Sequence, residues 1–225
     1  MIRIVEEAVK VPPVGLPGDL VLPERPRGIV VFAHGSGSSR HSPRNRSVAS
    51  TLQQSGFGTL LLDLLTEAEE DVDIRTRQLR FDIGLLASRL EDATDWVRDN
   101  PATRGLSVGY FGASTGGGAA LVAAAARPGV VAAVVSRGGR PDLAGPALRQ
   151  VEAPTLLIVG GEDDQVIQLN EQALAQLHCE KQLSIVPGAT HLFEEPGALD
   201  EVSALAAGWF GNHLTPPGFA DIEAL

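Results

Sequence analysis

Short runs of apolar residues recur along the chain and alternate with segments that have the periodicity of helices. Most runs are apolar at nearly every position, which predicts strands covered on both faces of a sheet. These runs span residues 28–33, 57–62, 106–111, 130–135, 155–159 and 182–186. Two earlier segments, residues 2–9 and 14–22, lie on either side of Pro12-Pro13 and are typical of a hairpin-like pair at a sheet edge.

One helical pattern is clear in the middle of the chain. Its apolar positions are spaced four or three residues apart, so they form one stripe on a helix that ends at Asn100-Pro101. The stripe consists of Leu79, Ile83, Leu86, Leu90, Ala93 and Val97. Further helices are expected over residues 44–54, 115–126, 167–177 and 199–213. This alternation predicts a mostly parallel, twisted α/β sheet with helices on both faces and ligands at the carboxyl ends of its strands.

Two segments carry no such pattern. The acidic stretch at residues 64–75 is the longest insertion between expected strands. Its run Glu67-Ala-Glu-Glu-Asp71 is interpreted as a solvated loop rather than a cation site, because no converging ligands accompany it. The tail, residues 216–225, is expected to lie on the surface. The sequence therefore leaves little room for a lid.

Composition limits the class of protein. With 225 residues, 44% of them hydrophobic, we expect a single globular domain over residues 1–225. The 28 acidic and 18 basic residues give a net charge of −10, which disfavours nucleic acid as a partner. The first residues lack the apolar core of a signal peptide and no long apolar window indicates a membrane span, so a cytoplasmic protein is expected. The single cysteine, Cys179, excludes an internal disulfide and is interpreted as a half-buried bystander.

The most informative motif is Gly112-Ala113-Ser114-Thr115-Gly116, between an expected strand and an Ala-rich helix. Its glycines allow a sharp turn, because they have no Cβ to collide with neighbouring segments. The turn raises the Ser114 hydroxyl above the carboxyl edge of the sheet, and the amide of Thr115 at the helix N-terminus faces the place where a substrate oxygen becomes negative. Ser114 is thus a candidate nucleophile, and Thr115 a candidate oxyanion-hole donor.

A serine nucleophile needs a base and a group that orients the base. Asp163 follows the expected strand at 155–159 and His191 follows the strand at 182–186, so both loops should emerge at the same sheet edge as Ser114. Asp164 is an alternative acid, although the Gly-x-x-Asp-x-x-Val spacing favours Asp163. His191 is the histidine that lies in a loop after the last expected strand; the others are His34, His41, His178 and His213.

The loop His34-Gly-Ser-Gly-Ser-Ser-Arg40 follows the strand at 28–33, and its glycines expose backbone amides near the turn at Ser114. We assign the amide of Ser36 as the second oxyanion-hole donor, with that of Gly37 as the alternative. Arg137 ends a further expected strand and has two interpretations. It contacts a substrate carboxylate, or it is the structural partner of a loop acid.

Together these motifs resemble those of α/β-hydrolases, and most closely the small dienelactone-hydrolase-like serine hydrolases. The resemblance covers nearly the whole chain: a His-Gly-x loop at 34–36, the turn at Ser114, Gly-x-x-Asp-x-x-Val at 160–166 and Gly-x-x-His at 188–191. It implies a three-layer α/β-hydrolase fold and hydrolysis of an acyl bond by Ser114, His191 and Asp163. Dienelactone hydrolases proper have a cysteine at the turn, so the serine here favours a carboxylesterase-type activity over lactone hydrolysis.

The expected function is a serine hydrolase that cleaves a small carboxylic ester, or a related thioester or lactone, through an acyl-enzyme. Its partner is a small-molecule acyl substrate, and we expect no cofactor, no metal and no membrane binding. One alternative is a catalytically silent relative that binds a ligand on the same fold. Another is a nucleotide-binding oxidoreductase, favoured by Gly35-Ser-Gly37 after a strand and by Asp63 after the next, but Arg40 stands where that fingerprint needs a third glycine.

Overall fold

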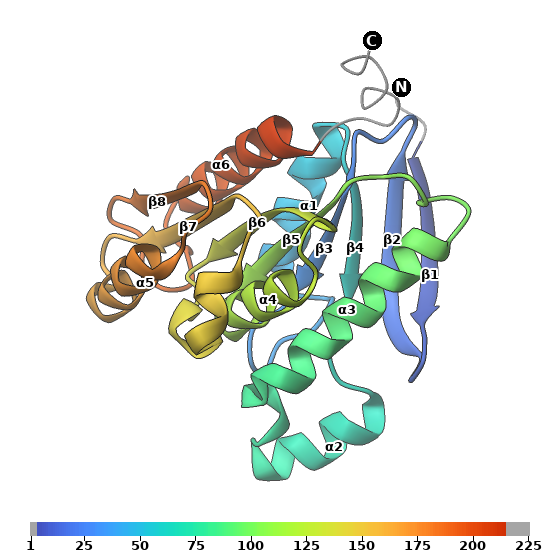
Figure 1. Ribbon diagram of the computed structural model, residues 1–225, viewed down its shortest axis with the longest axis horizontal. Helices are drawn as coiled ribbons and strands as arrows, with labels where there is room; N and C mark the ends of the chain where they lie inside the picture. The colour runs from blue at the N-terminus through green and yellow to red at the C-terminus, as the bar shows by residue number, and fades with distance from the viewer. Residues whose placement is uncertain (1–3, 215–225) are drawn as a thin grey trace.

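The computed structural model describes residues 4–214, and eight strands in this range form one sheet (Figure 1). Their order across the sheet is β1-β2-β4-β3-β5-β6-β7-β8. β1 and β2 pair antiparallel, as do β2 and β4, whereas all other neighbours are parallel. The strands are β1 (Ile4–Val11), β2 (Leu16–Pro23), β3 (Ile29–Ala33), β4 (Gly58–Leu62), β5 (Val108–Ala113), β6 (Val131–Arg137), β7 (Thr155–Gly160) and β8 (Lys181–Val186). The surface tail expected at 216–225 lies outside the described residues.

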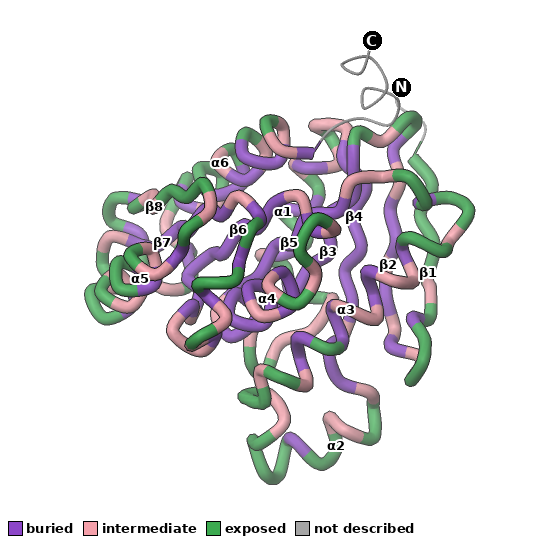
Figure 2. Tube along the Cα trace, in the orientation of Figure 1, coloured by how far each residue is buried: buried purple, intermediate pink, exposed green. Residues whose placement is uncertain are grey.

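Helices cover both faces of this sheet (Figure 1). They are α1 (Pro43–Gln54), α3 (Ile83–Asp99), α4 (Thr115–Ala126), α5 (Asp164–Gln176) and α6 (Ala198–His213). On one face, Val30 and Phe32 of β3 pack in a core with α1 and α6. On the other, Ile29 and Val31 pack with α3, α4 and the end of α5. The central strands are therefore buried along their whole length (Figure 2), as their continuous apolar runs predict.

The mostly parallel, three-layer α/β fold is confirmed, but the long apolar stripe is divided. Leu79 belongs to a separate short 3-10 helix, η1 (Leu79–Phe81), and α3 begins only at Ile83. The break occurs at Asp82, whose side chain accepts a hydrogen bond from the amide of Leu85 at 2.9 Å and so caps α3. A capping residue inside the stripe ends one helix and begins the next.

The interpretation of the acidic stretch as a solvated loop is wrong, because it contains the helix α2 (Glu67–Thr76). Thr66 and Glu69 form a capping box at its start. The Thr66 hydroxyl accepts from the amide of Glu69 at 3.2 Å, and the Glu69 carboxylate accepts from the amide of Thr66 at 2.8 Å. Acidic residues in the first turn also suit the positive end of the helix dipole. The apolar pattern of the sequence does not predict this helix, because the segment after Thr66 has too few apolar residues to form a stripe.

Among residues 4–214, no lid is evident over the carboxyl edge of the sheet. In the same range, no helix combines the length and the apolar character needed to cross a lipid bilayer.

Candidate functional site

Ser114 lies in a tight turn between β5 and α4, as its motif predicts. Its backbone has φ 52° and ψ −121°, a left-handed conformation that non-glycine residues rarely adopt. The neighbouring strand holds this conformation, because the amide of Ser114 donates to the carbonyl of Arg137 at 3.2 Å. The carbonyl of Ser114 accepts from the amide of Gly117 at 3.0 Å, which begins α4. These two hydrogen bonds thus fix the backbone of Ser114 at the carboxyl edge of the sheet, where α4 begins.

Glycines let α4 approach β3 and the turn closely. A Cβ at Gly116 would lie 2.3 Å from the carbonyl oxygen of Ala33, and one at Gly112 would lie 2.4 Å from the carbonyl oxygen of Gly116. Gly35 lies against Ser114 itself, since a Cβ there would be 3.1 Å from that of Ser114. Small residues at these positions therefore bring the start of α4 and the loop after β3 together.

The replacement Gly116→Ala should destabilise the protein by about 2–4 kcal/mol, because the new methyl group collides with backbone that has no room to move. The matched control is Gly208→Ala in α6, where nothing lies within 4 Å of the added Cβ. Alanine in a helix interior should stabilise that variant by about 0.5–1 kcal/mol. Urea unfolding of both variants measures the difference; equal midpoints for the two would contradict the packing described for α4.

His191 and Asp163 are in direct contact. Nδ1 of His191 lies 2.6 Å from Oδ2 of Asp163, with the imidazole N–H donating to the carboxylate. Their loops are also joined through the backbone, because the amide of Glu162 donates to the carbonyl of Ala189 at 2.9 Å. The alternative acid, Asp164, is exposed and begins α5. The geometry therefore brings His191 to Asp163 and leaves Asp164 outside this contact.

Ser114 and His191 line the same pocket, of about 260 Å³, which we call the Ser114 pocket. Ser36 from the loop after β3 also lines it, as does Arg137. The sequence reasoning missed its remaining wall, which comes from the N-terminus of α1 and includes Arg44. No motif marks that helix as part of a site; only its packing against the sheet brings it there.

The amide of Ser36 is held in place by His34. Nε2 of His34 accepts from the amide of Leu64 at 3.1 Å, so the ring proton is on Nδ1, which donates to the carbonyl of Gly35 at 2.9 Å. The amide of Ser38 donates to the same carbonyl at 3.2 Å. These two hydrogen bonds fix the Gly35 carbonyl, and we call them the His34 clamp. In a trans peptide the N–H points away from the C=O, so the clamp turns the N–H of Ser36 away from His34. No acceptor is found within residues 4–214 for the amides of Ser36 or Gly37.

His34 should make stability depend on pH. Burial lowers the pKa of His34 from its ordinary value of 6.5, against the opposing effects of the Gly35 hydrogen bond and of the charges of Asp63 and Glu70. Below that ordinary value the unfolded chain binds a proton that folded His34 does not. The free energy of unfolding should therefore decrease as the pH is lowered below 6.5, by up to about 1.4 kcal/mol per pH unit, until the folded histidine also protonates.

Urea unfolding at pH 7.5 and 5.5 tests this. The variant His34→Asn should lose less stability between the two pH values than the wild type. The control His41→Asn, which removes an exposed histidine of the same loop, should keep the wild-type dependence. A His34→Asn variant as sensitive to pH as the wild type would show that another group is responsible.

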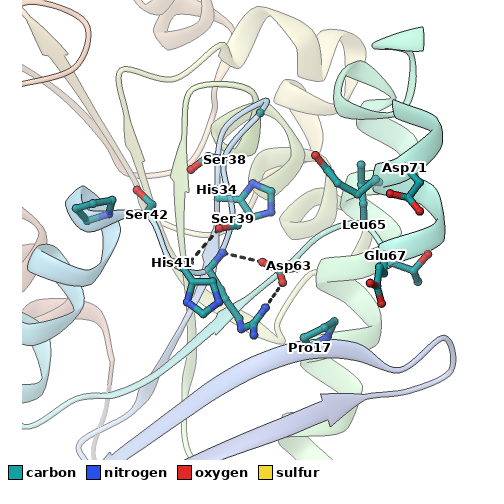
Figure 3. A pocket seen from close by; sticks show the side chains of 15 residues that line it. Pro17, His34, Ser38, Ser39, His41, Ser42, Asp63, Leu65, Glu67 and Asp71 are labelled. Carbon is teal, nitrogen blue, oxygen red and sulfur yellow. Dashed lines mark hydrogen bonds and ion pairs between the residues drawn. The ribbon is translucent and has the colours of Figure 1, made fainter. Parts of the chain in front are cut away.

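A larger cavity, of about 700 Å³ (Figure 3), adjoins the Ser114 pocket. Ser38 and Ser42 line both. Its walls come from the loop at residues 34–43, from the chain after β4 and from α2. Neither Ser114 nor His191 lines it. The chemistry expected of Ser114 therefore belongs to the smaller pocket, with the larger cavity beside it.

Asp63 lines this larger cavity (Figure 3) and binds Arg40. Its Oδ1 accepts from the backbone amide of Arg40 at 2.7 Å, and its Oδ2 forms an ion pair with the guanidinium. This is the acid that a nucleotide-binding oxidoreductase would need for a ribose. In this fold the Asp63 carboxylate is already bound to Arg40. Arg40 occupies the position where the dinucleotide-binding motif needs its third glycine.

The remaining candidates lie apart from the Ser114 pocket. Cys179 follows α5, its thiol is 3.8 Å from the Thr155 hydroxyl, and burial raises its pKa. His213 ends α6, 3.7 Å from Glu180. In the described part of the chain, no group of three or more His, Cys, Asp and Glu side chains is arranged to hold a metal ion.

A family model and several known proteins are similar to this chain. The model, described as the dienelactone hydrolase family, matches residues 16–210. The crystal structure of a dienelactone hydrolase from Anabaena variabilis is 65% identical, has a TM-score of 0.91, and the match covers 95% of this chain and 99% of that one. Two Mycobacterium tuberculosis proteins, of strains CDC 1551 and H37Rv, each named "Putative phosphoribosyl transferase", are 61% identical over 96% of this chain. The chain spans about half of their length, 48%.

Proposed function

Because this chain belongs to the dienelactone hydrolase family, we propose that it is a serine hydrolase that cleaves a small carboxylic ester, or a related thioester or lactone, through an acyl-enzyme on Ser114. The observation that carries the proposal is the 2.6 Å contact between His191 and Asp163 beside a pocket that His191 shares with Ser114. The name "Putative phosphoribosyl transferase" belongs to M. tuberculosis proteins that are about twice as long as this chain. The proposal therefore rests on the family and on this pocket.

In the first half of the reaction, Ser114 is the nucleophile. Since Nδ1 of His191 keeps its proton and donates a hydrogen bond to Asp163, Nε2 is free to accept the proton of the Ser114 hydroxyl. The serine oxygen then bonds to the substrate carbonyl carbon, and the carbonyl oxygen becomes an oxyanion. When the tetrahedral intermediate collapses, His191 returns the proton to the leaving alcohol or thiol, and the acyl group stays on Ser114.

The second half reverses these roles with water. His191 removes a proton from a water molecule, whose oxygen attacks the acyl carbon. The intermediate then collapses, Ser114 recovers its proton from His191, and the carboxylic acid leaves. Asp163 keeps the imidazole in the correct tautomer and stabilises its cationic form in both halves.

Backbone amides would stabilise the oxyanion in both halves. Thr115 is the first residue of α4, so its amide lies at the positive end of the helix dipole. The second donor is the amide of Ser36, which the His34 clamp orients, with Gly37 as the alternative. Removing one such donor usually costs about 100- to 1000-fold in kcat.

A fluorophosphonate probe and a panel of p-nitrophenyl esters of increasing acyl length test the proposal. Mass spectrometry should find the probe on Ser114 of the native protein, while heat-denatured protein stays unlabelled because the hydroxyl is no longer activated. At least the short esters should be hydrolysed. A native protein that neither reacts with the probe nor hydrolyses any ester would instead support the catalytically silent relative.

A further inference from the structure

The strand β1 forms one edge of the sheet, and its outer side has no partner strand within residues 4–214 (Figure 1). Six of its eight residues are exposed, and its register with β2 is unbroken from Ile4 to Val11. Natural edge strands are often short, bulged, covered or interrupted by proline, because an open edge pairs readily with another strand. β1 is long and regular and lies open in the described part of the chain, so it can accept a further strand.

The contact between β2 and β4 identifies the backbone groups of β1 that face outward. The carbonyl of Pro17 in β2 accepts from the amide of Asp63, which follows β4, at 3.0 Å, so the backbone of Pro17 faces β4. In an antiparallel pair, the residue opposite such a position directs its own N–H and C=O away from the partner strand. Lys10 lies opposite Pro17, so its backbone faces the open edge. Every second residue before it does the same: Ala8, Glu6 and Ile4.

The sequence of β1 is self-complementary about Ala8. Glu6 and Lys10 lie two residues before and two residues after Ala8, on the same face of the strand. Both side chains are exposed and take part in none of the ion pairs found within residues 4–214. If two copies of β1 pair antiparallel with Ala8 opposite Ala8, each Glu6 lies opposite Lys10 of the other copy, which stabilises the pair. Pairing centred on Glu7 would instead place two carboxylates opposite each other.

The opposite edge strand, β8, has no such complementarity. Its one charged residue is Lys181, whose ammonium binds the carbonyls of Leu174 and Leu177 at 2.8 and 2.6 Å in its own chain. Two copies of β8 would therefore bring no opposite charges together. Of the two edges, β1 is the one whose sequence favours a second copy of itself.

We propose that β1 binds β1 of a second copy of this chain, antiparallel and centred on Ala8, so that the two sheets join into one continuous sheet of a twofold-symmetric dimer. The Ala8 pair and both Glu6–Lys10 pairs would each exchange two N–H···O=C bonds across the interface. Val5, which is 55% exposed, would lie opposite the buried Val11 of the other copy and lose apolar surface to it. No residue of β1 lines the Ser114 pocket, so the inference is independent of the function proposed for Ser114.

Charge reversal on β1 tests the proposal. Sedimentation equilibrium should find a dimer of the full chain at about 100 µM. Glu6→Lys and Lys10→Glu should each raise the dissociation constant at least about tenfold, because each places like charges opposite each other twice in the dimer. The double variant Glu6→Lys/Lys10→Glu should return to within about threefold of the wild type. The two single replacements change the net charge in opposite directions, so weakening by both cannot come from net charge.

The matched control is Glu7→Lys, which reverses a charge at the next position of the strand. Glu7 is exposed, its backbone faces β2, and it would lie opposite the uncharged Val9 of the other copy. Its dissociation constant should stay within about threefold of the wild type. A monomer at every concentration overturns the proposal, as does a dimer that neither single reversal weakens, for instance one formed through β8.

Two further replacements at Ala8 test the backbone pairing and its register. Ala8→Pro removes an N–H that faces the open edge and no hydrogen bond to β2, so the variant should unfold in urea close to the wild type and yet be monomeric. In a Cys179→Ser background, Ala8→Cys should form a disulfide-linked dimer when oxidised with diamide, because the paired Cα atoms would be about 5.5 Å apart. Lys10→Cys should not, since its two copies would be about 13 Å apart. A folded, dimeric Ala8→Pro variant, or faster cross-linking through Lys10→Cys, would overturn the proposed interface.

Discussion

Replacing Ser114 by alanine should lower kcat for ester hydrolysis by about 10⁴-fold or more. The reason is that the acyl-enzyme needs the Ser114 oxygen, whereas the oxyanion-hole amides and the pocket would leave only a weak residual rate. The measurement is steady-state hydrolysis of the best ester from the panel, with active-site titration to exclude contamination by wild-type enzyme.

The Ser114→Ala variant should also keep its fold. The turn at Ser114 is held by backbone hydrogen bonds to Arg137 and from Gly117, which the replacement does not remove. The variant should therefore unfold in urea close to the wild type. Turnover within tenfold of the wild type, in a folded variant, would disprove the proposed nucleophile.

Asp163→Asn should lower kcat by about 10³- to 10⁴-fold. The Asp163 carboxylate accepts the Nδ1 proton of His191, and an amide in its place can donate to Nδ1, which moves the ring proton to Nε2 and removes the base that Ser114 needs. Stability should change less than activity, because the Asp163–His191 pair lies at the edge of the molecule and the imidazole is 40% exposed.

The adjacent aspartate provides the matched control. Asp164→Asn removes the same charge one residue later, at an exposed position that begins α5. It should leave kcat within about threefold of the wild type and cost a few tenths of a kcal/mol in stability, through the weaker interaction with the helix dipole. A large loss of kcat in Asp164→Asn, with Asp163→Asn active, would reverse the assignment of the acid.

Local patterns predicted most of the fold because each of them acts over a few neighbouring residues. Continuous apolar runs identified the buried strands, and the helix at 115–126 has the ends expected from its motif. The failures were also local. Asp82 divided the stripe at 79–97 by capping α3, and the capping box at Thr66 and Glu69 began a helix in a segment too polar to show an apolar stripe.

The candidate site was predicted in the same way, through the topology of the sheet. Parallel strands bring their carboxyl ends to one edge, so residues that follow different strands meet there however far apart they are in the chain. That rule was enough to select Ser114, Asp163 and His191. It did not select Arg44, which reaches the Ser114 pocket from the start of α1 and follows no strand end directly.

The sequence by itself predicted the mostly parallel sheet, most of its helices and the loops that carry Ser114, Asp163 and His191 to the carboxyl edge, because these follow from periodicity and from glycines at a sharp turn. Only the tertiary structure decided that His191 contacts Asp163 rather than Asp164, and that Arg137 has no acidic partner among residues 4–214. Both depend on differences of a few ångströms between loops. Such differences are set by packing among distant segments, which no local pattern in the chain records.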